Sequence, residues 1–149
     1  MTHTFTKHLY HWVWSTKDRK PYITPVIEKQ LYPYLASVVA KHGGICIVVG
    51  GTFDHLHLLV KLKPSASVSN LISALKVGSS GWIHQHFQEP GFRWQAGYGS
   101  FTVCTSQEER VKRYIINQRQ HHQTESFYDE FSGLLDAHGV DYDPEYLFT

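Results

Sequence analysis

The sequence has few cysteines, no long apolar run and no lysine or arginine after Arg119. Its two cysteines, Cys46 and Cys104, lie in apolar strand-like surroundings, which argues against a disulfide framework or a cysteine metal cluster. No stretch of about 18 apolar residues is present, and the start lacks the features of a signal peptide. We therefore expect a protein of the cytoplasm with no membrane contact.

Charge is unevenly distributed along the chain, although the formal net charge is only +1. Residues 1–123 carry all 14 basic residues and six acids, a formal charge of +8, whereas residues 124–149 carry seven acids and no basic residue. A basic body suits a phosphate backbone, because lysine and arginine displace its counterions. Ordinary solvated surface charge would produce the same asymmetry, so charge alone leaves both interpretations open.

Apolar patterning predicts one domain, 1–149, that alternates strands and helices. Strands are predicted at 8–16, 45–52, 55–62 and 92–104, and helices within 24–44, 64–87, about 107–122 and about 126–138. The second of these helices is expected to loosen around Gly78 to Gly81, and the third to open with a capping box formed by Ser106 and Glu109. The order predicts an α+β fold of the ferredoxin-like split β-α-β type, an antiparallel sheet with helices mainly on one face.

Two histidines stand one residue apart in the apolar segment "FDHLHLLVKL". Side chains alternate along a strand, so His55 and His57 share one face, with Cα atoms about 6.5 to 7 Å apart. With 11 histidines in 149 residues, roughly 0.8 such pairs arise by chance, so the pattern alone is weak. The pair is either a metal-binding unit or two hydrogen-bonded histidines on a sheet face.

A metal site needs a further ligand, and "RYIINQRQHH" supplies a candidate. Tyr114 and Gln118 are four residues apart, which places them on one face of a helix. Two imidazoles with the amide oxygen of Gln118 would suit Mg²⁺ or Mn²⁺ and leave positions open for phosphate oxygens. Beside a polarised phosphate the phenol of Tyr114 becomes a candidate nucleophile, although it could equally be a helix aromatic packed on the sheet.

The segments "HLHLLVKL", "FRWQAGYGSF" and "RYIINQRQHH" together resemble the HUH-superfamily single-tyrosine transposases of small bacterial insertion sequences, including their REP-associated relatives. The resemblance covers nearly the whole chain. It implies a protein that binds hairpins in single-stranded DNA, then cuts and rejoins one strand through a 5′-phosphotyrosine. It further implies that His55, His57 and Gln118 hold the metal, that Tyr114 is the nucleophile, and that the protein is a homodimer.

Basic residues around these segments are candidates for phosphate contacts. They are Lys17, Arg19, Lys20, Lys61, Lys63, Lys76, Lys112, Arg113 and Arg119. Two other readings stay open: a non-cutting binder of structured single-stranded DNA, and an unrelated metalloenzyme of cupin or hydrolase type. The second would need further His, Asp or Glu ligands shortly after "HLH", and residues 58–63 contain none.

Overall fold

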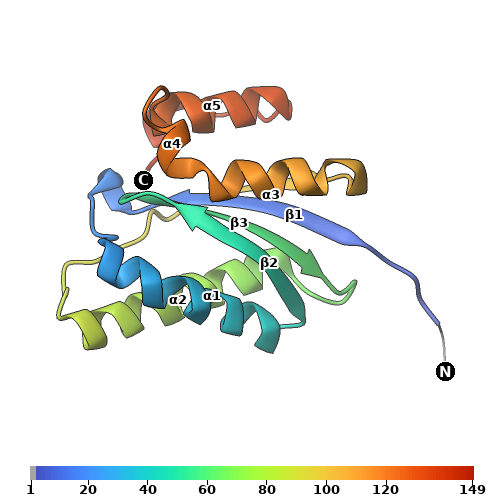
Figure 1. The fold of residues 1–149 in the computed structure, drawn as a ribbon, viewed down its shortest axis with the longest axis horizontal. Coiled ribbons are helices and arrows are strands. Elements are labelled where there is room, and N and C mark those ends of the chain that lie inside the picture. Colours follow the sequence, from blue (N-terminus) through green and yellow to red (C-terminus); the bar gives the residue numbers. More distant parts are fainter. Residues whose placement is uncertain (1–2) are drawn as a thin grey trace.

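The computed structural model describes residues 3–149 and shows a sheet between two layers of helices (Figure 1). The strands are β1 (His8–Ser15), β2 (Gly44–Gly51), β3 (His55–Leu62) and β4 (Gly99–Val103). The helices are α1 (Pro25–Lys41), α2 (Val68–Phe87), α3 (Glu108–Ile116), α4 (Gln118–His121) and α5 (Phe127–Ala137), with single 3-10 turns at Lys17–Arg19, Thr105–Gln107 and Pro144–Tyr146.

The four strands form one antiparallel sheet in the order β2-β3-β1-β4. β2 and β3, joined by a short connection, form an antiparallel hairpin with one bulge between Cys46 and Val48. The two central strands, β1 and β3, each have a neighbour on both sides, so their backbone groups are paired along most of their length. The predicted α+β, ferredoxin-like fold class is confirmed.

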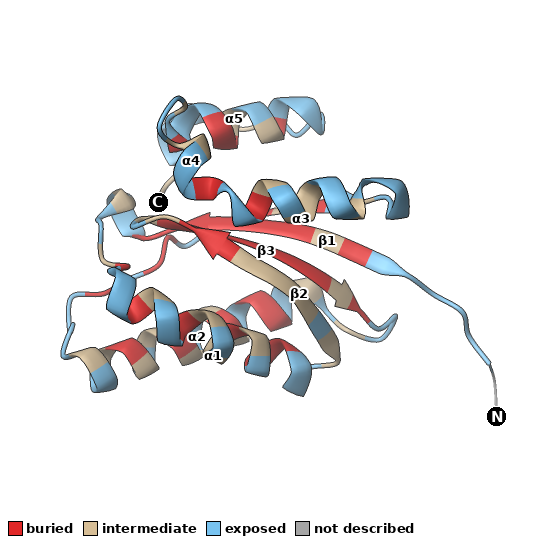
Figure 2. Ribbon diagram, viewed as in Figure 1, coloured by how far each residue is buried: buried red, intermediate tan, exposed pale blue. Residues whose placement is uncertain are grey.

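The helices are distributed differently from the expectation of one main face. α1 and α2 cover one face, as predicted, but α3, α4 and α5 lie over the other (Figure 1). The reason is that both sides of β1 carry apolar side chains. Trp12 and Trp14 enter a core with α1 and α2, while Val13 enters a second core with Phe127 and Phe131 of α5. Figure 2 shows buried residues in both helical layers.

Several element boundaries depart from the predicted ones. α2 runs unbroken through Gly78 and Gly81, because packing against the sheet outweighs the low helix propensity of glycine. The capping box at Ser106 does not form: this residue lies in a 3-10 turn, and α3 begins at Glu108 without a side-chain cap. The predicted strand 92–104 is paired in the sheet only at 99–103, apart from a bridge between Trp94 and Thr16.

Both cysteines are free thiols. Cys46 is half-buried in β2, whereas Cys104 is exposed, because β4 ends one residue before it. Within residues 3–149, no helix combines the length and apolar character needed to cross a bilayer.

Candidate active site

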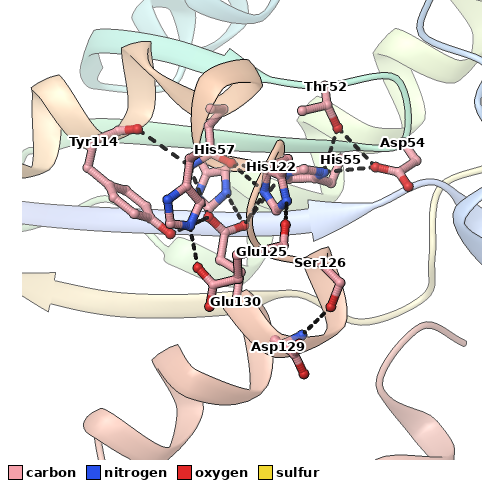
Figure 3. Close-up of polar contacts among 12 residues, drawn as sticks. Thr52, Asp54, His55, His57, Tyr114, His122, Glu125, Ser126, Asp129 and Glu130 are labelled. Atoms are coloured by element: carbon pink, nitrogen blue, oxygen red, sulfur yellow. Dashed lines mark hydrogen bonds and ion pairs between the residues drawn. The ribbon is translucent and has the colours of Figure 1, made fainter.

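His55 and His57 project from β3 toward the layer formed by α3, α4 and α5, and both are fully buried. Strand alternation sends Leu56 and Leu58 into the opposite, apolar core. In Figure 3 the two imidazoles lie close to the side chains of Tyr114, His122 and Glu130. His55 and His57 therefore lie on one face of β3, as predicted, and other polar side chains lie on the same side.

Tyr114 and Gln118 approach the histidines from the helices that cover this face of the sheet. The continuous helix predicted for them is interrupted between the two residues. Asn117 has φ −94° and ψ 24°, so α3 ends at Ile116 and α4 starts at Gln118. The buried Gln118 still points at the histidines, with its Oε1 atom 3.0 Å from His55 Nε2. The Tyr114 ring centroid lies 5.7 Å from that of His57. All four residues proposed for the site thus converge within one chain.

A glycine in β2 sets how closely α3 approaches the sheet. A Cβ atom added to Gly50 would stand 2.1 Å from the carbonyl oxygen of Ile115, a backbone atom. Real Cβ atoms do not come that close, so any larger residue would push α3 outward. The absence of a side chain at Gly50 therefore helps to bring Tyr114 and Gln118 over the histidines.

Glu130 and His122 also belong to the site, and sequence reasoning missed both. Glu130 Oε1 lies 2.9 Å from His57 Nε2 and 3.0 Å from His122 Nε2. The Tyr114 hydroxyl and the Gln118 amide donate to the other carboxylate oxygen, Oε2. One signal was available: Glu130 stands three residues after Phe127 and one before Phe131, so a charged residue occupies the apolar stripe of its helix.

Each strand histidine has an outer hydrogen-bond partner. His55 Nδ1 lies 2.8 Å from Asp54 Oδ1, and His57 Nδ1 lies 2.8 Å from His11 Nε2. When Nδ1 carries the ring proton, both partners can accept it, and the Nε2 lone pair of each ring is then directed into the site. Such outer partners orient metal-binding imidazoles in proteins generally. His11 comes from β1, where it shares a face with Val13, the residue paired with His57.

Burial controls the charge of the imidazoles next to the sheet. It lowers the pKa of His11 to about 3, with a further contribution from the neighbouring His57. It also lowers the pKa of His57 to about 4, against the opposing effect of Glu130. Both rings are therefore neutral near pH 7, the state in which an imidazole nitrogen can bind a cation.

Burial and the contacts of the Glu130 carboxylate together shift the pKa values of Glu130, His122 and Tyr114. Burial alone would raise the pKa of this carboxyl, but hydrogen bonds with His122 and His57 hold it well below its usual range. Burial would lower the pKa of His122, yet the bond with Glu130 raises it. Burial and the Glu130 charge raise the pKa of Tyr114 above its ordinary value, so this phenol stays protonated and donates.

The arrangement fits a divalent cation. His55, His122 and Glu130 each offer a ligand atom, and these atoms lie within 4.8 Å of one another. The Nε2 atom of His57 and the amide oxygen of Gln118 face the same point. Imidazole nitrogens combined with oxygen donors suit Mg²⁺, Mn²⁺ and related ions. The predicted ligands His55, His57 and Gln118 thus lie close together, and their role in holding a metal stays a prediction.

Two of the basic candidates lie beside this site. Arg19 and Arg119 line a cavity of about 380 Å³ that also includes His55, His122 and the half-exposed Phe53. The Arg19 guanidinium lies over the rings of Phe127 and Phe148. The cavity therefore joins positive charge and an aromatic ring directly to the histidine cluster.

The remaining basic candidates have other surroundings. Lys17 and Lys20 are exposed next to Arg19, and Lys112 and Arg113 lie on α3 beside Tyr114. Lys61 lies near the other end of β3, about 20 Å from His55 along the strand, and Lys63 follows the last residue of this strand. Lys76, on α2, points its ammonium at the carbonyls of Gln95, Ala96 and Gly97, and burial lowers its pKa to about 8.

The fold and the site define a class: α+β proteins that gather two strand histidines, a tyrosine and a glutamine on one side of an antiparallel sheet. The chain belongs to the IS200-like transposase family, whose sequence profile, described as "Transposase IS200 like", matches residues 4–118. It is thus a transposase-type, DNA-processing protein, and the predicted family is confirmed.

Solved structures agree with this assignment at the level of the fold. A candidate transposase from Deinococcus radiodurans R1 superposes with a TM-score of 0.64 at 24% identity, covering 79% of this chain and 95% of its own. A REP-associated tyrosine transposase bound to a REP hairpin superposes with a TM-score of 0.62 at 14% identity, covering 98% and 89% respectively. A search of curated protein sequences finds no match.

Proposed function

We propose that this transposase cuts and rejoins single-stranded DNA through a covalent bond between Tyr114 and a 5′ phosphate. One observation carries the proposal: Tyr114, Gln118, His55 and His57 come from separate parts of the chain and converge on one point. A tyrosine packed for stability alone would not need its hydroxyl to donate to a buried carboxylate, that of Glu130, beside the histidines.

The chain's own groups support each part of the reaction. The Tyr114 oxygen forms the bond to phosphorus as the bond to the 3′ oxygen breaks, so the phenol loses its proton and the DNA end becomes a 3′ hydroxyl. His55, His57 and Gln118 would hold a Mg²⁺ or Mn²⁺ ion, which supplies Lewis-acid polarisation of the phosphate when bound. Rejoining is the same exchange in reverse, because the phosphotyrosine preserves the energy of the broken bond.

Hairpins in single-stranded DNA are the proposed substrate. The hairpin bound to the REP-associated neighbour supports this choice, as do the arginines and the exposed aromatic ring of the cavity beside His55. Arg19 and Arg119 would contact phosphates there. The homodimer stays a prediction, since the four site residues meet within one chain and do not require a second copy.

The test is to trap the covalent adduct. Labelled single-stranded DNA carrying the hairpins that flank the gene is incubated with protein, with and without Mn²⁺, and resolved under denaturing conditions. We expect a metal-dependent adduct that peptide mass analysis maps to Tyr114 and that Tyr114→Phe abolishes. Tyr128→Phe, a change at a partly exposed tyrosine of α5, serves as the control and should form the adduct normally.

Two results would contradict the proposal: an adduct on another residue, or an adduct in the Tyr114→Phe protein. Hairpin binding without any cleavage by the unaltered protein would favour the non-cutting binder instead.

A further inference from the structure

Glu130 is a charged residue where the fold alone would place an apolar one. Its side chain is 1% exposed, and it lies in α5 between Phe127 and Phe131, both buried in the second core. Burying a carboxylate is costly unless other groups neutralise and hydrogen-bond it. The proposed transposase site, built from His55, His57, Tyr114 and Gln118, does not by itself account for this carboxylate.

One oxygen of Glu130 faces the histidines. Oε1 lies 2.9 Å from His57 Nε2 and 3.5 Å from His55 Nε2. Gln118 Oε1 lies 3.0 Å from His55 Nε2. In an octahedral site with bonds of about 2.1 Å, neighbouring ligand atoms are about 3 Å apart. The nitrogens and oxygens are thus already spaced like members of one coordination sphere.

The other oxygen of Glu130 faces the nucleophile. The Tyr114 hydroxyl donates to Oε2, and the Gln118 amide nitrogen, 3.0 Å away, donates to the same atom. The carboxylate therefore has two distinct sides, one directed at the imidazoles and one at the phenol (Figure 3). A carboxylate can use its two oxygens for different partners in this way.

We propose that Glu130 is a bridging ligand, whose Oε1 binds the divalent cation together with His55 and His57 while Oε2 positions the Tyr114 hydroxyl beside it. The inference rests on the proposed function, since it concerns the same metal site. An anionic oxygen binds a hard dication more strongly than the neutral amide of Gln118 does. The carboxylate also offsets part of the charge that the cation would bring into a buried site.

Mn²⁺ binding to the full-length protein tests this assignment without measuring DNA cleavage. Free Mn²⁺ is quantified by electron paramagnetic resonance during titration of the unaltered protein, Glu130→Gln, His57→Ala and Asp129→Asn. We expect Glu130→Gln to weaken binding at least about 10-fold, the lower range seen when even indirect metal contacts are removed. Asp129→Asn removes an equal charge from the same turn of α5, but at an exposed position, and should change binding less than about twofold.

Each outcome decides between hypotheses. Binding by Glu130→Gln that equals or exceeds that of the unaltered protein overturns the inference, because Glu130 would then be a neutral neighbour or a competitor of the cation. If His57→Ala binds Mn²⁺ as well as the unaltered protein does, the proposed metal site itself fails, and the inference fails with it. If His57→Ala loses Mn²⁺ affinity but Glu130→Gln does not, the metal site stands and only the role of Glu130 is rejected.

A second measurement covers the case in which Glu130→Gln does not fold. The unaltered protein is labelled with ¹³C at its glutamate carboxyl carbons and titrated with the diamagnetic ion Mg²⁺. We expect the Glu130 signal to shift as the ion binds, while that of the exposed Glu145 stays in place. An unshifted Glu130 signal alongside shifted His55 and His57 ring signals would overturn the inference.

Discussion

The two faces of the central strands carry opposite kinds of side chain. Toward α1 and α2, β1 and β3 present Trp12, Trp14, Leu56 and Leu58, which form part of the large apolar core. Toward α3, α4 and α5, the same strands present His11, His55 and His57, all at most 4% exposed. A single alternating pattern thus supplies both layers of the molecule.

The difference between the faces separates stability from chemistry. Apolar burial contributes about 25 cal/mol per Å² and needs no specific partner, so the α1 and α2 face stabilises the sheet. Buried polar groups must instead be paired, and the two histidines of β3 each have a partner on both sides: His55 contacts Asp54 and Gln118, and His57 contacts His11 and Glu130. The apolar face thus holds the strands in place, and the opposite face can then orient its histidine side chains.

The largest contrast is expected between two adjacent residues of β3. His55→Ala should abolish DNA cleavage while hairpin binding persists, because the cation loses a ligand but the phosphate contacts remain. Leu56→Ala, on the opposite face, should lower the free energy of unfolding by about 2–5 kcal/mol and leave the Mn²⁺ affinity of the folded protein unchanged. Gel cleavage assays and urea unfolding measure the two effects. Near-normal cleavage by His55→Ala would show that the metal assignment is wrong.

A second contrast concerns glycines. Gly50→Ala should lower cleavage by about 100-fold, because the new Cβ would meet the Ile115 carbonyl oxygen at 2.1 Å and displace α3 with its tyrosine. Gly81→Ala in α2 is the matched control: nothing lies within 4 Å of its added Cβ, so activity should be kept and stability should rise slightly. Rates under single-turnover conditions give the comparison, and equal rates for both variants would remove Gly50 from the positioning of Tyr114.

The polar face should make stability depend on pH. Burial sets the pKa of His11 at about 3 and that of His57 at about 4, against about 6.5 in the unfolded chain. Between about pH 6.5 and 4 the unfolded state therefore binds more protons. The free energy of unfolding should fall as the pH is lowered through this window, by up to about 1.4 kcal/mol per pH unit for each histidine.

Urea unfolding in the presence of a chelator, repeated from pH 7 to pH 4, measures this slope. The His11→Gln variant removes one of the two titrating rings and should unfold with a shallower pH dependence. A slope identical to that of the unaltered protein would mean that His11 is not buried in the neutral form.

The smallest expected effect is electrostatic and also distinguishes the faces. Hairpin affinity should weaken about tenfold or more between about 50 and 200 mM salt, because bound phosphates release counterions. Arg119→Ala, beside the site, should reduce the slope of log affinity against log salt by about 1. Lys41→Ala, an exposed change at the end of α1, should leave the slope unaltered. If the two variants had the same salt slope, Arg119 would have no phosphate contact that Lys41 lacks, and the DNA would not be assigned to the face of the site.

Local patterns were sufficient to predict most of the fold. Thr24 caps the start of α1 by accepting from Ile27 N, three residues further on, and the alternation of β3 predicted that His55 and His57 would share one face. Patterns of this kind depend on residues within a few positions of one another. The predicted helix 107–122 was wrong at Asn117, where φ −94° and ψ 24° separate α3 from α4 although neither proline nor glycine stands there.

The sequence by itself determined the succession of strands and helices, the shared face of the histidine pair, and the spacing of the tyrosine and the glutamine, because each depends on periodicity, on short spacing or on a recognisable motif. Only the tertiary structure decided that Glu130, His122 and His11 join them. Glu130 is 73 residues from His57 in the chain, and His11 is 46 residues from it. No periodicity connects positions so far apart; they meet because α5 and β1 both pack against β3, and buried polar groups there must find partners.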